Sequence, residues 1–180
     1  ADMAYVVYND YAINDASGNG DGVLDYGESV LLSLTLENVG LVDASGVDAT
    51  IASGNGNITI SDDAAFFGDI LSLQTVTVTD EYAFEVSPDI ADGELVIFNI
   101  EATDGDSTWP SFFSIQAHAP VMEYVSFAID DAAGNGNGRL DPGETANLIV
   151  SIENTGSSEA YNVEVALSCS GKNFVTVNNS

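Results

Sequence analysis

Two stretches of this chain match each other at a constant offset of 116 positions, from residue 14 to residue 130. The first reads NDASGNGDGVLDYGE from Asn14, and the second reads DDAAGNGNGRLDPGE from Asp130. The match needs no gap and spans about 44 positions, from Tyr8 to Ile51 of the first copy. A match of this length indicates a duplicated unit of about 116 residues, which is an ordinary size for one domain.

The repeat divides the chain into two unequal domains. The first copy covers 1–118, and the second covers 119–180 and stops about halfway through the unit. Residues 117–120, Ala-His-Ala-Pro, are predicted to form the hinge, because proline ends a strand. The second copy lacks counterparts of 75–117, so we expect half a sandwich with an open apolar face. Either the other half belongs to a longer parent protein, or a second chain covers the face by self-association.

Apolar and polar residues alternate with a period of two in both copies, which is typical of strands with one buried face. No stretch shows helical periodicity. About six to eight short strands in a unit of this size predict an all-β fold. We expect tandem immunoglobulin-like β-sandwich repeats with the second copy incomplete. The residues predicted to face the core are Leu32, Leu34, Leu36, Val47, Ala49, Ile51, Tyr82, Phe84, Val86, Val96, Phe98, Ile100, Phe113 and Ile115, with second-copy counterparts Leu148, Val150, Ile152, Val163, Val165 and Leu167.

The charge balance is strongly acidic, with 29 Asp and Glu residues against two basic ones and a formal net charge of -27. Nucleic acids and anionic membrane surfaces would repel such a chain, so we expect neither as a partner. No run approaches the ~18 apolar residues of a membrane span. The single cysteine, Cys169, precludes an internal disulfide. The first residues lack the basic region of a signal peptide, so we expect a segment excised from a longer protein.

Residues 17–28, SGNGDGVLDYGE, fit the twelve-position calcium loop of EF-hand proteins. Calcium takes about six to eight oxygen ligands from alternating loop positions, with a glycine at the sixth position for a sharp turn. Gly22 occupies that position, and Gly138 is its counterpart. The predicted ligands are Asn19, Asp21, the Val23 carbonyl, Asp25 and Glu28 in the loop 14–28, and Asn135, Asn137, the Arg139 carbonyl, Asp141 and Glu144 in the loop 130–144.

Two departures from the EF-hand pattern shape this prediction. The loop is followed by an alternating, strand-like segment and not by a helix, so the calcium loop is expected between two strands. The first position holds no aspartate, which predicts a loop widened at its start. Where Ser17 and Ala133 fail as ligands, Asp15 and Asp131 are predicted to reach in, and Asn14 and Asp130 are second choices for the same role.

The same loops also admit a simpler interpretation as ordinary turns rich in Gly, Asp and Asn. Two observations favour a metal. The pattern occurs twice, each time ending in Gly-Glu before a strand, and the first copy gathers four carboxylates with no base nearby. Their mutual repulsion should loosen the loop when no cation is bound. Because extracellular calcium modules bind at about 0.1–1 mM, we expect about one calcium ion per repeat in an exported protein.

The acidic loops, together with the segments LLSLTLENVG, NLIVSIENTG, FEVSPDIADGE and FFSIQAHAPV, resemble immunoglobulin-like repeats of large secreted bacterial proteins. They are most similar to modules C-terminal to the catalytic domain of gingipain-type cysteine peptidases, and to related adhesion repeats. The resemblance covers nearly the whole chain. It implies a non-catalytic stalk, adhesion or accessory role outside the cell, since the catalytic Cys and His motifs of the peptidase have no counterpart in this sequence.

Three other residues bear on function. His118 and Cys169 are the only residues of their types and lie in different copies, so no catalytic residue is assigned and no enzyme activity is expected. Trp109 would stack on a sugar ring if it were exposed, although a lone tryptophan in a sandwich more often belongs to the core.

The sequence thus predicts a non-catalytic, calcium-stabilised extracellular module that acts as a stalk, spacer or adhesion domain of a larger secreted or surface protein. The alternative is a carbohydrate- or partner-binding module attached to a secreted hydrolase or peptidase, and a hydrolase fragment is a third reading. The expected partners are the neighbouring domains of the parent protein. A cell-surface protein or glycan is left open as a further partner.

Overall fold

The computed structural model describes residues 3–170 and 175–177, and every regular element in them is a β-strand. These residues contain no helix that is long and apolar enough to cross a membrane. The strands are β1 (Val6–Asn14), β2 (Leu24–Asp25), β3 (Ser29–Asn38), β4 (Ala44–Ala52), β5 (Ile58–Asp62), β6 (Ala64–Ile70), β7 (Thr75–Val86), β8 (Leu95–Thr103), β9 (Thr108–His118), β10 (Met122–Asp130) and β11 (Asn147–Asn154).

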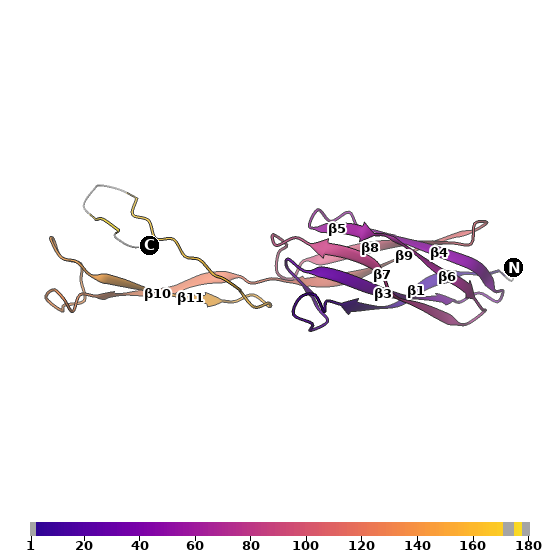
Figure 1. The fold of residues 1–180 in the computed structure, drawn as a ribbon, viewed down its shortest axis with the longest axis horizontal. Coiled ribbons are helices and arrows are strands. Elements are labelled where there is room, and N and C mark those ends of the chain that lie inside the picture. The colour runs from indigo at the N-terminus through magenta and orange to yellow at the C-terminus, as the bar shows by residue number, and fades with distance from the viewer. Residues whose placement is uncertain (1–2, 171–174, 178–180) are drawn as a thin grey trace.

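Strands β1 to β9 form two sheets that pack face to face around one core (Figure 1). One sheet has the order β1-β3-β7-β5, and the other has the order β2-β9-β8-β4-β6. These orders match the A-B-E-D and C-F-G sheets of immunoglobulin domains, with β2 and β6 added at the two edges of the second sheet. The immunoglobulin-like sandwich is confirmed. The first copy has nine strands, more than the six to eight that the sequence predicts, because β2 and β6 extend the second sheet.

The core follows the predicted alternation. Phe98 stacks on Phe113 with ring centroids 5.2 Å apart and packs against Phe84 at 5.1 Å, so aromatic side chains from both sheets meet in the middle. The hydroxyl of the fully buried Tyr82 donates to the Ala49 carbonyl at 3.0 Å, which links β7 of one sheet to β4 of the other. All fourteen residues predicted to face the core in the first copy are buried.

The second copy reproduces the first hairpin of the unit. β10 pairs with β11 in the register in which β1 pairs with β3, so that Tyr124 lies opposite Ile152 as Tyr8 lies opposite Leu36. The same irregularity follows at the next position of both hairpins. The sequence repeat is therefore a structural repeat. The second hairpin extends away from one end of the sandwich (Figure 1).

The remainder of the second copy differs from the prediction. The alternation in 163–167 predicts a strand equivalent to β4, but the structure has none there. In the first copy β4 lies between β6 and β8, whose counterparts one repeat further on fall at or beyond residue 180. Without neighbours this segment has no backbone partners. As expected for half a sandwich, most large apolar side chains among the described residues of the second copy are exposed, including Leu148, Val150, Ile152, Val163, Val165 and Leu167.

The Glu-Asn-x-Gly sequence at the end of β3 holds one end of the sandwich together. The fully buried Asn38 accepts the N–H groups of Tyr5 (3.1 Å) and Gly40 (3.0 Å) on its side-chain oxygen. Its amide donates to the carbonyls of Val42 (2.8 Å) and Ile70 (3.0 Å). A Cβ at Gly40 would overlap the backbone that enters β1, so only glycine fits. One side chain thus satisfies four backbone groups from three segments.

We predict that Asn38→Ala lowers the free energy of unfolding by about 3 kcal/mol, because four backbone groups lose a buried partner. Urea denaturation followed by fluorescence of the single tryptophan, Trp109, measures this in the first repeat. Asn154→Ala is the matched control. Asn154 makes the equivalent bonds to Val121, Gly156 and Ser158 in an exposed setting. The control should shift the Trp109 transition by less than ~0.5 kcal/mol. Equal effects of the two changes would contradict this account.

Candidate metal centre

The first acidic loop, residues 15–28, closes one end of the sandwich between β1 and β3. Its second half is anchored to the domain. Leu24 is fully buried in the core, and β2 pairs in parallel with the end of β9, with Leu24 opposite Ala117 and Asp25 opposite His118. Because these pairs belong to the sandwich itself, the fold fixes the position of Asp25.

Asp15 lies inside the loop, with only 3% of its surface exposed. Its carboxylate accepts the N–H groups of Asp21 (3.0 Å) and Gly22 (3.2 Å), so the loop backbone curls around it. Gly22 has a φ of 81°, a conformation that favours glycine and explains this residue at the turn. The hydroxyl of Ser17 points elsewhere and donates to the Ser29 carbonyl at 2.8 Å. Asp15 does reach into the loop, and its role as a metal ligand stays a prediction.

The side chain of Asn19 brings two further carboxylates together. Its amide nitrogen donates to Asp25 Oδ2 at 2.7 Å and to Asp21 Oδ2 at 3.2 Å. Its oxygen accepts the Asp21 N–H at 2.9 Å. The positive end of an amide dipole thus lies between two carboxylates. A cation at this position would interact with the two carboxylates more favourably than the neutral amide does.

Glu28 points back across the loop toward its first residues. Glu28 Oε1 accepts the Asn19 N–H at 3.2 Å. A Cβ at Gly18 would overlap the Glu28 carboxylate, so the glycine provides the space for it. Burial raises the pKa of the Glu28 carboxyl, and the charges of Asp25 and Asp15 raise it further, while backbone hydrogen bonds oppose the shift. The ionised form of Glu28 is therefore disfavoured by its own surroundings.

Two oxygens of this loop are buried and have no hydrogen-bond partner: Asp25 Oδ1 and Glu28 Oε2. Asp25 as a whole is only 4% exposed. Burying a carboxylate oxygen without a donor or a counter-charge is unfavourable, and such groups are normally paired or coordinate a metal. The donor set consists of carboxylate and amide oxygens, which suits a hard cation such as calcium. The residues present therefore fit the predicted ion.

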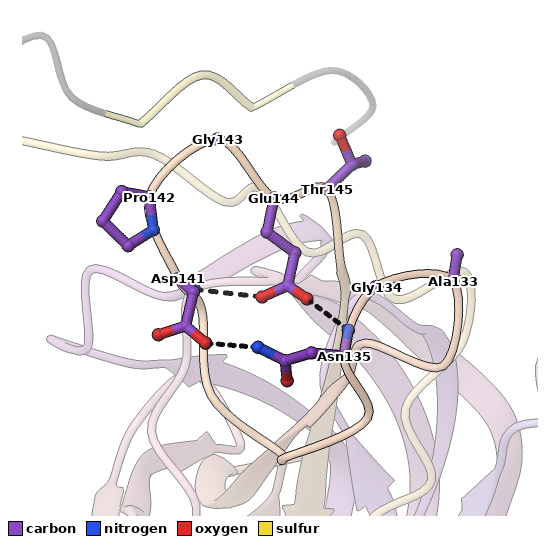
Figure 2. Close-up of a pocket in the computed structure, with 8 residues that line it drawn as sticks. All are labelled: Ala133, Gly134, Asn135, Asp141, Pro142, Gly143, Glu144 and Thr145. Carbon is purple, nitrogen blue, oxygen red and sulfur yellow. Dashed lines mark hydrogen bonds between the residues drawn. The ribbon is translucent and has the colours of Figure 1, made fainter.

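The second loop repeats the geometry of the first. Asp131, 4% exposed, accepts the N–H groups of Asn137 (2.9 Å) and Gly138 (3.1 Å). Asn135 donates from its amide to Asp141 Oδ2 at 2.7 Å, and Glu144 Oε1 accepts the Asn135 N–H at 3.1 Å (Figure 2). The predicted side-chain ligands of the second copy thus form hydrogen bonds within their own loop, as those of the first do.

The two loops differ in how their carboxylates are satisfied. In the second loop both oxygens of Glu144 accept backbone N–H groups, from Asn135 and from Asp141, the latter at 3.0 Å (Figure 2). Hydrogen bonds from the amides of Asn135 and Asn137 lower the pKa of the Asp141 carboxyl. In addition, Asn137 replaces Asp21, so the predicted ligands of the second loop include one carboxylate fewer and repel one another less.

The two second-choice candidates, Asn14 and Asp130, have hydrogen-bond partners outside the ligand sets described above. Asn14 donates to Asp80 at 2.7 Å and accepts the Ala16 N–H, and Asp130 accepts the Ala132 N–H. Among the described residues, no three Asp, Glu, His or Cys side chains converge closely enough to enclose an ion by themselves. Amide and carbonyl oxygens would have to complete the ligand set. The carbonyls of Val23 and Arg139 are predicted to be among these oxygens.

A further group of residues was not predicted from the sequence. An open cleft beside the first loop is walled on its far side by Ser158 and Tyr161 of the second copy. Tyr26, within the loop, lines the same cleft. The available signal was a difference between the two loops, since Tyr26 of the first copy aligns with Pro142 of the second.

The structure places Trp109, His118 and Cys169, the residues considered for other functions, in three different settings. Trp109 is 5% exposed and belongs to the core, so it is not available to stack on a sugar ring. His118 Nδ1 is hydrogen-bonded to the Ser157 hydroxyl at 2.7 Å. Cys169 is exposed and lies in a segment without regular structure.

No family model matches the chain, and no curated protein sequence matches it. One solved structure that resembles it is the CsuC–CsuE chaperone–tip adhesion subunit pre-assembly complex from the archaic chaperone-usher Csu pili of Acinetobacter baumannii. The identity is 10%, the TM-score is 0.25, and the match covers 76% of this chain and 85% of that one. Because this TM-score is low, the fold assignment rests on the sheet order and not on the likeness to that structure.

We predict that Gly18→Ala weakens calcium binding to the first loop by at least ~10-fold, about 1.4 kcal/mol, because the new methyl group displaces the Glu28 carboxylate. Isothermal titration calorimetry measures the affinity. Gly54→Ala is the matched control, since a Cβ there meets no atom and no unusual backbone angle. If the two variants bind calcium equally well, Glu28 is not a ligand in the position described.

Proposed function

We propose that this chain is a non-catalytic, calcium-stabilised extracellular module that serves as a stalk or spacer within a larger secreted protein. The proposal includes one calcium ion in each acidic loop. The resemblance to repeats of secreted bacterial proteins, gingipain-type modules among them, supports the location and the accessory role. No residue of the chain needs to perform chemistry on a substrate for this function.

The observation that carries the calcium proposal is the pair of buried, unpartnered oxygens, Asp25 Oδ1 and Glu28 Oε2. Both belong to residues that the sequence pattern selects as ligands. With Asp15, Asn19 and Asp21 they form the proposed set of side-chain ligands in one loop. The chain has only two basic residues against 29 acidic ones, so a protein cation is rarely at hand to offset such a charge. An ion from the medium is the natural counter-charge.

The stalk proposal follows from what the ion would hold in place. The loop joins β1 to β3, and β2 within it pairs with β9, the last strand of the sandwich. A bound ion would therefore fasten the first and last parts of the domain at one end. In a chain that cannot form an internal disulfide, a metal can take over the role of a covalent staple.

The alternative of a carbohydrate-binding module has less support. Its one specific candidate residue, Trp109, is buried. A partner-binding role for the exposed faces of the module stays open, but no described residue singles out a particular partner. The stalk is therefore the function that the geometry supports best.

We predict that saturating calcium raises the melting temperature of the first repeat and that a chelator reverses the rise. At a calcium concentration about 100 times the dissociation constant the gain is about 2.7 kcal/mol, or roughly 10 °C for a domain of this size. Differential scanning fluorimetry on Trp109 measures it. Glu28→Ala should remove most of the rise, because it deletes one of the two unpartnered oxygens.

Glu144→Ala is the matched control for that experiment. It should lower the number of ions bound per chain by about one and leave the calcium-dependent shift of the Trp109 transition in place. If neither variant changes the calcium-dependent rise, the ligand assignment is wrong. If wild-type protein binds no calcium, the acidic loops are turns without a metal and the proposal fails.

A further inference from the structure

The first acidic loop lies at the joint between the two repeats. Strand β2 pairs with the last two residues of β9, and the Tyr26 N–H donates to the His118 carbonyl at 3.0 Å. β9 ends at His118 and β10 begins at Met122, so the connection between the repeats is short. The candidate metal loop therefore adjoins the segment that leads into the second repeat (Figure 1).

The second repeat also reaches back to this loop. We call residues 155–161, which follow β11, the return turn. The Tyr26 hydroxyl donates to the Glu159 carbonyl of the return turn at 3.1 Å. Ser158 and Tyr161 of the return turn face the loop across the open cleft, whose loop side is formed by Gly18, Asn19, Asp25, Tyr26, Gly27 and Glu28.

A second contact fastens the return turn to the first repeat. The Asp92 carboxylate accepts the N–H groups of Ala119 (3.1 Å) and Ser157 (3.3 Å) and the hydroxyl of Ser157. Because that hydroxyl proton goes to Asp92, the neighbouring His118 Nδ1 acts as donor to Ser157 Oγ. The second repeat is thus held at two places, one at Asp92 and one at Tyr26.

We propose that the first loop is a calcium-controlled joint, in which the ion fixes Tyr26 and thereby the direction of the second repeat. This inference rests on the proposed calcium site. Tyr26 lies directly between Asp25 and Gly27, and Glu28 follows, so the two residues with unpartnered oxygens flank it. Without a cation, repulsion among the carboxylates loosens the loop and releases the Tyr26 contact. The Asp92 contact then remains as the hinge about which the second repeat moves.

Thermodynamic linkage makes this joint testable from both sides. If calcium favours the docked return turn, then docking must raise the affinity of the first loop for calcium by the same factor. The second loop supplies an internal control. It has Pro142 at the position of Tyr26, so it has neither the N–H group nor the hydroxyl that form the joint.

Double electron–electron resonance on the full chain tests the proposal. Spin labels are placed at Thr79→Cys on β7 and Ser151→Cys on β11, both exposed, in a Cys169→Ser background. We expect a broad distribution of distances with a chelator and a narrow one with calcium. Glu144→Gln should preserve the narrowing, and Glu28→Gln should abolish it, because only the first loop adjoins the joint.

Tyr26→Phe isolates the joint from the metal site. It removes the hydroxyl that bonds to Glu159 and keeps the aromatic ring and all proposed ligands. We expect the distance distribution to remain broad with calcium present. Calorimetry should show that the first loop still binds calcium, with an affinity lowered by about 5-fold or more, while the affinity of the second loop stays unchanged.

The outcomes separate this inference from the proposed function. If calorimetry shows calcium in the first loop while the distance distribution stays the same, the joint is refuted and the calcium-stabilised module stands. If the narrowing survives in Tyr26→Phe, the joint does not act through Tyr26 and the inference fails. If no calcium binds at all, both proposals are overturned.

Discussion

Two carboxylate oxygens without partners, Asp25 Oδ1 and Glu28 Oε2, are the constraint on which the first repeat depends. The fold holds them where they are. Asp25 pairs with the end of β9 and is only 4% exposed, and Glu28 immediately precedes β3. The other oxygen of each carboxylate does have a partner, since Asp25 Oδ2 accepts from the Asn19 amide and Glu28 Oε1 accepts the Asn19 N–H. What the site lacks is positive charge, and the composition of the protein leaves almost none to supply it.

Because of where this loop lies, its excess of negative charge affects more of the chain than the loop itself. It joins the first strand pair, pairs with the last strand and faces the return turn of the next repeat. An ion in the loop would therefore act on the stability of one domain and on the orientation of the next. A stalk needs both properties, since each domain must persist and successive domains must keep their direction. The second loop has Asn137 in place of Asp21 and Pro142 in place of Tyr26, and so only the first combines both.

Much of the fold was predictable because it rests on patterns that are local in sequence. Leu32, Leu34 and Leu36 alternate with polar residues and are buried. The absence of an aspartate at position 17 pointed to Asp15, which does reach into the loop. The missing strand at 163–167 shows the limit of such patterns, because a strand also needs neighbours to pair with and alternation does not supply them.

The parts that were not predicted depend on residues far apart in the chain. The Glu-Asn-x-Gly sequence was visible as a motif, but the role of Asn38 depends on carbonyls and N–H groups from three separate segments. Nothing in the sequence around Tyr26 indicates that this residue contacts the second repeat. Its contact with Glu159 spans 133 residues, and only the folded arrangement of two repeats brings them together.

The most direct test of this account is a crystal structure of the chain grown with millimolar calcium, with anomalous diffraction used to locate the ions. The account predicts one anomalous peak in each loop, about 2.3–2.6 Å from the carboxylate oxygens. In the first loop the peak should lie next to Asp25 Oδ1 and Glu28 Oε2. Water alone in both loops under these conditions would contradict the central claim.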